Sequence, residues 1–233
     1  MNGLRIHRVT TLDLRVTPRP WPFAQARRAE IAAHFADAQR SKPKLWNGRV
    51  LLARNPHFQD SRFSADYFET DFASFLAWRD WGFPDSEVVN SFGMGALRAS
   101  DGAFVLGEMA AHTANAGRIY FPSGTPDLDD IRGGALDIPG SVAREVEEET
   151  GIVPQDYRAG PDWTCVSVGA SVAMICILDV DMHSEALRAR IRANLARQSA
   201  PELSAIHLVR GRADLSSAMP RFVTAFLEAE LPG

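Results

Sequence analysis

The sequence predicts a mixed-sheet fold of the α/β or α+β class, and three observations favour it. Strand-like segments are mixed with helical ones in no strict βαβ order. Hydrophobic residues make up 45% of the 233 residues and charged residues 23%, which is ordinary for a globular chain. No internal repeat or low-complexity segment is present in the sequence. A chain of this length accommodates one large domain or two small ones.

A smaller N-terminal α/β region is expected over residues 1–86. Its expected elements are a strand over 4–16, a helix over 23–39, and strands over 50–54 and 63–70. Thr70 or Asp71 can cap a short helix that is rich in aromatic residues. Gly82 and Pro84 interrupt the pattern after that helix, so we expect a domain boundary near residue 86.

The second domain is expected over residues 87–233. Its expected elements are strands over 88–98, 103–109, 119–121, 163–180 and 206–209, helices over 141–150, 184–197 and 219–231, and a loop over 125–140. Ser100, Asp101 and Gly102 form a typical hairpin turn between the first two strands. Gly151 is suited to end the first helix, because glycine adopts the left-handed conformation at helix C-termini without strain.

Charge and composition argue against several functions. A net charge of −4 gives no reason to expect binding to nucleic acid or to an anionic membrane. The longest purely apolar run, residues 172–178, is too short to cross a bilayer, and the N-terminus has no apolar signal core. Cys165 and Cys176 match no zinc-binding spacing. We therefore expect buried, reduced thiols in a cytoplasmic protein.

The most informative segment is the helix that ends in four glutamates. Glu145, Glu147, Glu148 and Glu149 lie in its last turns, where the helix dipole makes each exposed carboxylate unfavourable by about 0.3–1 kcal/mol. Pairs three or four residues apart repel each other as well. A cation among the carboxylates would offset both effects.

Helix geometry places Glu145, Glu148 and Glu149 within an arc of about 100°, with Glu147 on the opposite side. Three hard oxygen ligands on a rigid helix suit Mg²⁺ or Mn²⁺. The alternative is an ordinary charged helix face in contact with solvent. Arg144 can pair with Glu148 one turn away or with a carboxylate from the preceding loop.

Two adjacent motifs resemble those of a known family. Residues 144–152, REVEEETGI, match the second half of the Nudix box, R-E-U-x-E-E-x-G-U with U aliphatic, and residues 121–124, FPSG, resemble its F-P-G-G entry. The resemblance to Nudix hydrolases implies an α/β/α sandwich with a mixed sheet. It also implies metal-dependent hydrolysis of a phosphoanhydride in a nucleoside diphosphate linked to another group, with Mg²⁺ or Mn²⁺ as cofactor.

The resemblance also implies roles for individual residues. Glu145 and Glu149 would be the principal metal ligands, and Glu148 a further ligand or the partner of a metal-bound water. Arg144 and Glu148 are the expected catalytic residues. Gly124 and Asp127 would belong to the loop on the substrate side.

The loop between the two motifs departs from the family pattern. Arg144 follows Gly124 by 20 residues, which is longer than in the Nudix box, and the position of the box glutamate falls on Leu136. Asp137 or Asp127 is therefore expected to orient Arg144 instead. Because the first half of the box is altered, a non-catalytic Nudix-fold sensor or regulator that binds a nucleotide is the principal alternative to an enzyme.

Two features of the N-terminal segment bear on the identity of the substrate. Residues 45–48, LWNG, and the aromatic helix near residues 72–81 resemble the UDP-glucose/UDP-galactose diphosphatase branch of the family, which favours a UDP-sugar. Trp46 and Trp78 could stack on a base or belong to the core. Coenzyme A diphosphate hydrolysis ranks lower, because no coenzyme A motif precedes the box. Glu108 and Glu202 are candidate general bases by chemistry alone. The expected partner is a small nucleotide, and a homodimer is left open.

Overall fold

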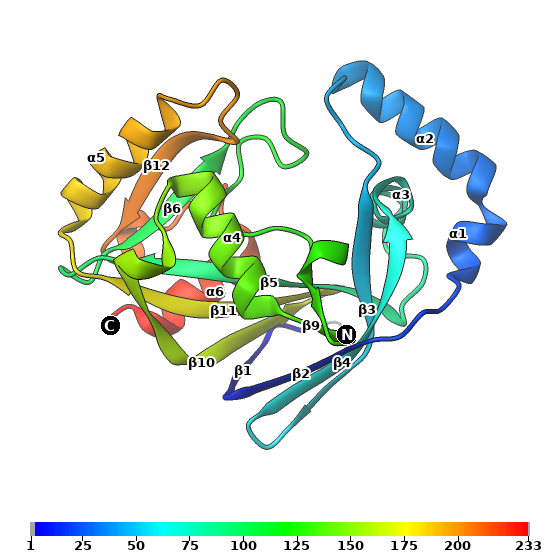
Figure 1. Cartoon of the computed structure of the whole chain (residues 1–233), viewed down its shortest axis with the longest axis horizontal. Helices are drawn as coiled ribbons and strands as arrows, with labels where there is room; N and C mark the ends of the chain where they lie inside the picture. The colour runs from blue at the N-terminus through cyan, green and yellow to red at the C-terminus, as the bar shows by residue number, and fades with distance from the viewer. Residues whose placement is uncertain (1–2, 233) are drawn as a thin grey trace.

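The strand β5 (Val88–Arg98) joins the two halves of the sheet. It pairs in parallel with β11 (Ser171–Val180) and antiparallel with β3 (Arg49–Gln59) and β6 (Phe104–Met109). The computed structural model describes residues 3–232, in which twelve strands form one mixed sheet (Figure 1). A mixed α/β fold is thus confirmed.

The remaining strands extend this sheet on either side. They are β1 (Arg5–Val9), β2 (Thr11–Val16), β4 (Arg62–Asp71), β7 (Ile119–Tyr120), β8 (Ile131–Arg132), β9 (Ala135–Leu136), β10 (Tyr157–Val168) and β12 (Leu203–Val209). The helices are α1 (Pro22–Ala26), α2 (Arg28–Ser41), α3 (Phe72–Asp80), α4 (Ile138–Thr150), α5 (Ser184–Leu195) and α6 (Arg221–Glu230). Short 3₁₀ turns lie at Leu128–Asp130, Pro154–Asp156 and Arg212–Asp214.

The N-terminal segment differs from its predicted form in two places. The strand expected over 4–16 is two strands, because β1 pairs with β10 whereas β2 pairs with β4. The helix expected over 23–39 is also divided, since Arg27 leaves the helical conformation at φ −113° and ψ 23°. The Arg27 guanidinium then lies 4.0 Å from the centre of the Trp81 ring, a cation–π contact that favours the break. The predicted cap of α3 is confirmed, with Asp71 accepting from the Ser74 amide at 2.8 Å.

The acidic helix α4 begins three residues earlier than predicted. Asp137 caps it by accepting from the Gly140 amide at 3.0 Å, and Pro139 occupies the first turn, where its missing N–H has no consequence. Gly151 ends the helix as expected, in the left-handed conformation at φ 72°. The predicted loop over 125–140 therefore contains the start of α4, two short strands and a 3₁₀ turn.

Glycines on β5 allow α4 to pack closely against the sheet. A Cβ atom on Gly93 would lie 2.6 Å from Cγ2 of Val142, and one on Gly95 would lie 2.5 Å from Cγ2 of Val146. Phe92, which points to the other face of β5, has its ring centre 5.5 Å from that of Phe222. Because α4 and α6 cover opposite faces, the layers are helix, sheet and helix, as the expected sandwich requires.

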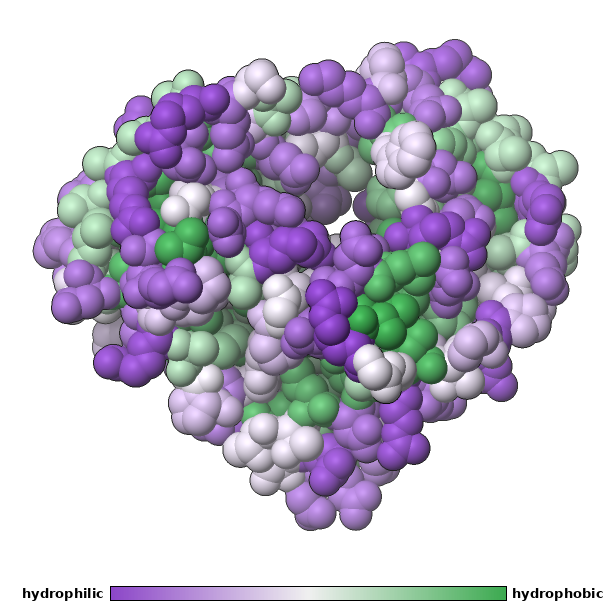
Figure 2. All heavy atoms as spheres, in the orientation of Figure 1, coloured by the Kyte–Doolittle hydropathy of each residue, from purple (hydrophilic) through white to green (hydrophobic). Residues whose placement is uncertain are grey.

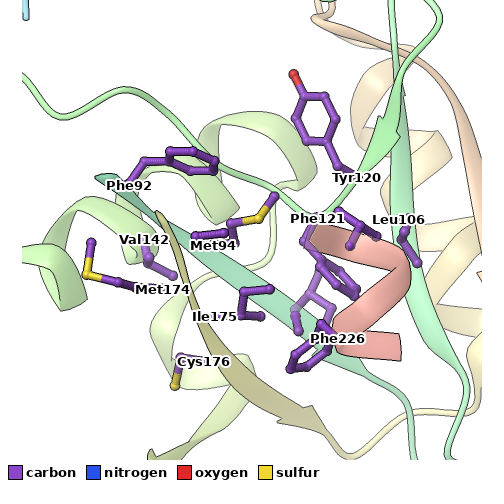
Figure 3. Close-up of a cluster of buried hydrophobic side chains, with 14 of the residues drawn as sticks. Phe92, Met94, Leu106, Tyr120, Phe121, Val142, Met174, Ile175, Cys176 and Phe226 are labelled. Carbon is purple, nitrogen blue, oxygen red and sulfur yellow. The ribbon is translucent and has the colours of Figure 1, made fainter. Parts of the chain in front are cut away.

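An aromatic cluster fixes the segment that leads into the candidate site. The rings of Phe104, Phe121 and Phe226 lie 5.5–5.9 Å apart in edge-to-face contacts. Figure 3 shows the Phe121 ring facing Phe226, whereas the neighbouring Tyr120 side chain points away from this cluster. The next residue, Pro122, accepts a hydrogen bond from the Gly95 amide at 3.1 Å. The chain after β7 is thereby held against β5.

The two cysteines are free and buried, as expected from the sequence. Among residues 3–232, none of the helices has the length and apolar character needed to cross a membrane.

Candidate functional site

Two glutamates of α4 face the short loop that follows β7. The Glu149 residue is 5% exposed, and its Oε1 accepts from the Ser123 amide at 3.4 Å. The Glu145 carboxylate packs so closely on Gly124 that an added Cβ would lie 2.3 Å from Oε1. Gly124 therefore lies against Glu145, and a larger residue at this position would displace the carboxylate.

Burial and mutual repulsion both disfavour the charged forms of these glutamates. Burial raises the pKa of Glu145 to about 7; the charge of Arg144 opposes this rise, and that of Glu148 adds to it. Burial, followed by the charge of Glu145, raises the pKa of Glu149 well above its ordinary value. The protein thus holds two carboxyl groups together without supplying enough positive charge for both.

Arg144 is anchored by a carboxylate from the preceding loop. Its Nη2 lies 3.0 and 3.2 Å from the two carboxylate oxygens of Asp130, and its Nη1 lies 2.7 Å from Oε1 of Glu145. Burial alone lowers the pKa of Arg144, but the hydrogen bond to Asp130 and the nearby charges raise it overall. The guanidinium therefore stays charged and connects the loop to a candidate ligand.

Asp130 takes the role that the sequence assigned to Asp137 or Asp127. Besides Arg144, it accepts from the Ser141 hydroxyl at 3.0 Å and from the Asp127 amide at 3.0 Å. Asp137 instead caps α4, and Asp127 caps the 3₁₀ turn that contains Asp130. The expectation for Asp137 and Asp127 was wrong because the longer loop folds into a turn of its own. The turn brings the Asp130 carboxylate to Arg144, although Asp130 does not occupy the position of the box glutamate.

Glu148 lies at the edge of this arrangement. Its side chain is 61% exposed, and its Oε2 lies 3.7 Å from Nη1 of Arg144. Glu147 is exposed, as its position on the helix predicted. Within residues 3–232, no group of three His, Cys, Asp or Glu side chains is arranged to hold a metal ion. The structure therefore brings Glu145 and Glu149 to one loop and leaves Glu148 beside Arg144.

The chemistry of these groups nevertheless fits a divalent cation. Glu145 and Glu149 supply hard oxygen donors, which Mg²⁺ and Mn²⁺ prefer. Both carboxyl groups are held largely away from water, and Glu149 has the single Ser123 amide at 3.4 Å as its hydrogen-bond donor within the described chain. Bound positive charge would stabilise their ionised forms. Mg²⁺ usually keeps several waters and binds through one or two carboxylates, so a complete protein cage is unnecessary.

A cavity of about 580 Å³ opens beside the Ser123–Gly124 loop. It lies between α3, the strand β5, the loop before β7 and the start of α6. Figure 2 shows the surface hollowed between the part of the molecule that carries α4 and the part that carries α1 to α3. A volume of this size is typical of small-molecule sites. The sequence did not predict this cavity, because its walls come from five separate segments of the chain.

The candidate general bases and the two tryptophans considered for stacking lie in different surroundings. Glu108 accepts a hydrogen bond from Nε2 of His207 at 2.8 Å. Glu202 is exposed, yet its charge contributes to the raised pKa values of Glu145 and Glu149. Trp78 is completely buried and belongs to the core, whereas Trp46 is 82% exposed. Trp78 is therefore excluded as a stacking surface for a ligand.

The sequence matches no family model and no curated protein. Solved structures of similar form include a MutT protein from Methanosarcina mazei Go1, at 20% identity and a TM-score of 0.39, covering 61% of this chain and 92% of that one. The Nudix hydrolase RenU from M. smegmatis is 12% identical with a TM-score of 0.38, covering 61% and 86% of the two chains. A bifunctional NMN adenylyltransferase/ADP-ribose pyrophosphatase from Francisella tularensis is 12% identical with a TM-score of 0.39, covering 67% and 45%.

Proposed function

We propose that this protein is a Nudix-type hydrolase that cleaves a phosphoanhydride bond in a nucleoside diphosphate linked to another group. One observation carries the proposal. Glu145 and Glu149 are held together against the Ser123–Gly124 loop, although burial and repulsion oppose their ionisation. A helix with a purely structural role would gain no stability from this buried pair of carboxyl groups, whereas a helix that binds a cation would use both of them as ligands.

In this proposal Glu145 and Glu149 hold Mg²⁺ or Mn²⁺, and Glu148 contributes a further oxygen or contacts a water bound to the metal. When bound, the cation would neutralise phosphate charge and lower the pKa of water. Arg144 keeps Glu145 in place through a 2.7 Å contact and is itself held by Asp130. It acts as a positioning residue for Glu145 and Glu148. Gly124 leaves the Glu145 carboxylate room to face the substrate loop.

Asp127 supports the site indirectly. Its side chain accepts from the Asp129 amide at 2.8 Å, and its amide donates to Asp130 at 3.0 Å. The 3₁₀ turn so formed orients the Asp130 carboxylate toward α4. The proposed role of Asp127 is therefore to shape the loop rather than to contact the reacting phosphate.

We favour a UDP-sugar as the substrate, on the basis of the resemblance in the N-terminal segment. The proposed division into residues 1–86 and 87–233 assigns that segment to substrate recognition. Phe72, Phe75 and Arg79 of α3 line the cavity beside the Ser123–Gly124 loop, which supports this assignment. The N-terminal region would then complete a substrate site whose chemistry resides on α4.

A non-catalytic sensor with the same fold is the second candidate. The altered loop between Gly124 and Arg144 motivates it. The anchoring of Arg144 by Asp130 favours the enzyme, because the longer loop still delivers a carboxylate to the arginine. A sensor would bind a nucleotide with no need for the carboxyl pair on α4.

The test is a hydrolysis assay with Mg²⁺ or Mn²⁺ against UDP-sugars, ADP-ribose, NADH, coenzyme A and nucleoside triphosphates, with products identified by mass. We expect cleavage of one class that stops when a chelator is added. Glu147→Gln, on the exposed side of α4, is the matched control for Glu149→Gln. Binding of a panel member without cleavage of any would favour the sensor and overturn the hydrolase proposal.

A further inference from the structure

We infer that the cavity between α3, β5 and α6 binds a nucleobase, with Asn90 reading the hydrogen-bonding edge of the base. The inference specifies where the base of the substrate would bind. It rests on the proposed hydrolase function for the position of the diphosphate. The cavity opens at Ser123 and Gly124, next to the carboxylates of α4. A ligand that fills the cavity therefore has one end near Glu145.

Asn90 carries a polar group that the described protein leaves without a partner. Its side-chain Oδ1 is buried, yet it accepts no hydrogen bond from residues 3–232. A buried acceptor without a donor is unfavourable, so such groups commonly mark a water or ligand position. The amide offers an acceptor and a donor side by side, and nucleobase edges present the complementary pair.

Strand geometry directs Asn90 into the cavity. Asn90, Phe92 and Met94 alternate along β5 and all line the cavity, whereas Gly93 and Gly95 face α4. The Phe92 ring meets Phe222 edge to face, and Phe222 remains partly exposed. The cavity therefore combines aromatic surfaces with one amide, which suits a flat heterocycle better than a sugar.

Three arginines also line the cavity. Arg118 and Arg221 line it, and neither has an ion-pair partner in the part of the chain that the structure describes. Arg79 lines it from α3. Guanidinium groups bind phosphate oxygens through paired hydrogen bonds. These arginines would neutralise the diphosphate once the base has entered the cavity.

The Ser123–Gly124 loop lies alongside β5. The Gly95 amide donates to Pro122 at 3.1 Å, and Asn90, Ser123 and Gly124 all line the same cavity. A base bound at Asn90 would therefore direct its phosphates toward the candidate metal site.

The experiment measures binding without turnover. Methylene-bridged analogues of UDP, ADP, GDP and CDP, whose carbon bridge resists hydrolysis, are titrated calorimetrically into the whole protein with Mg²⁺ present. Methylenediphosphonate, which lacks a base and a ribose, is the comparison ligand. We expect one or more nucleotide analogues to bind at least ten-fold more tightly than methylenediphosphonate. Equal affinity of all five ligands would overturn the inference.

Variants then locate the base. Asn90→Ala should weaken the preferred analogue ten-fold or more and leave methylenediphosphonate unchanged, and Asn90→Asp should change the order of preference among the four bases. Phe222→Leu, which keeps apolar volume, should weaken all four analogues. Gln155→Ala, an exposed amide that lines a different cavity, is the matched control. Wild-type affinity in both Asn90→Ala and Phe222→Leu would place the base elsewhere.

The two proposals fail separately. If the analogues bind in an Asn90-dependent way but no natural nucleotide is hydrolysed, the cavity assignment stands and the hydrolase proposal falls. If metal-dependent hydrolysis proceeds with the same kcat/KM in wild type and Asn90→Ala for every substrate class, the hydrolase stands and the cavity assignment falls.

Discussion

Arg144 and Asp130 are joined by two hydrogen bonds from Nη2, at 3.0 and 3.2 Å, across a separation of 14 residues. Asp130 is 4% exposed, so the contact is largely protected from water. It ties the long loop to the middle of α4, beside Glu145. The position of a candidate metal ligand therefore depends on a residue outside the helix.

Asp130→Asn should lower turnover ten- to a hundred-fold and lower the free energy of unfolding by about 1–3 kcal/mol, because the Arg144 guanidinium loses its charged partner. Steady-state kinetics and urea unfolding measure the two effects. Asp129→Asn, the exposed neighbour, should change neither. Wild-type kcat in Asp130→Asn would show that the contact does not position Glu145.

Glu149→Gln should keep the fold and reduce turnover by orders of magnitude. The amide is nearly isosteric and removes a buried negative charge, so the metal-free variant should melt at a higher temperature than the wild type near neutral pH. Added Mg²⁺ or Mn²⁺ should raise the Tm of the wild type and raise that of the variant much less. Glu147→Gln should behave as the wild type throughout. Normal turnover in a correctly folded Glu149→Gln protein would remove this residue from the metal site.

Gly124→Ala should reduce activity because the new methyl group would lie 2.3 Å from Oε1 of Glu145 and force that carboxylate away. Overpacking of this kind destabilises by about 1–3 kcal/mol. Gly211→Ala is the matched control, since a Cβ there meets open space. Differential scanning calorimetry and kinetics on both variants test the close approach, and equal behaviour of the two would contradict it.

The stability of the metal-free protein should depend on pH through Glu145. Its pKa rises from an ordinary value of 4.5 to about 7, with burial as the principal cause. The folded state therefore binds this proton more tightly than the unfolded chain does. The resulting contribution to stability is full below about pH 4.5, decreases as the pH rises, and is lost above about pH 7.

The measurement is the difference in Tm between wild type and Glu145→Gln from pH 4.5 to 8, which isolates the contribution of this residue. We expect the variant to gain stability relative to the wild type as the pH increases. Added Mg²⁺ should reduce the relative gain in Tm of the variant, because the cation stabilises the ionised Glu145 of the wild type. A difference that stays constant across the range would show that Glu145 titrates normally.

The two cysteines should react slowly with thiol reagents in the native protein. Burial raises the pKa of Cys165 to about 12 and that of Cys176 to about 11, so the reactive thiolate is scarce at neutral pH. Labelling with a thiol-specific chromogenic disulfide should be slow in buffer and rapid in denaturant. Fast labelling of either cysteine under native conditions would show that its strand opens readily.

Much of the fold could be predicted because its signals are local. The strand β5, the Asp71 cap of α3 and the Gly151 end of α4 all follow from residues a few positions apart. The acidic face of α4 follows from the helical period in the same way. The break at Arg27 could not be predicted, since its stacking partner Trp81 is distant in the sequence.

By itself, the sequence determined that a cluster of carboxylates would lie on one helix and that a glycine would end that helix, because helix geometry and backbone conformation act over a few residues. The tertiary structure alone decided that Asp130 would anchor Arg144, and that Asn90, Arg118 and Phe222 would border one cavity. These relationships join segments whose distances are set by how the sheet and its helices pack, and packing depends on the whole chain at once.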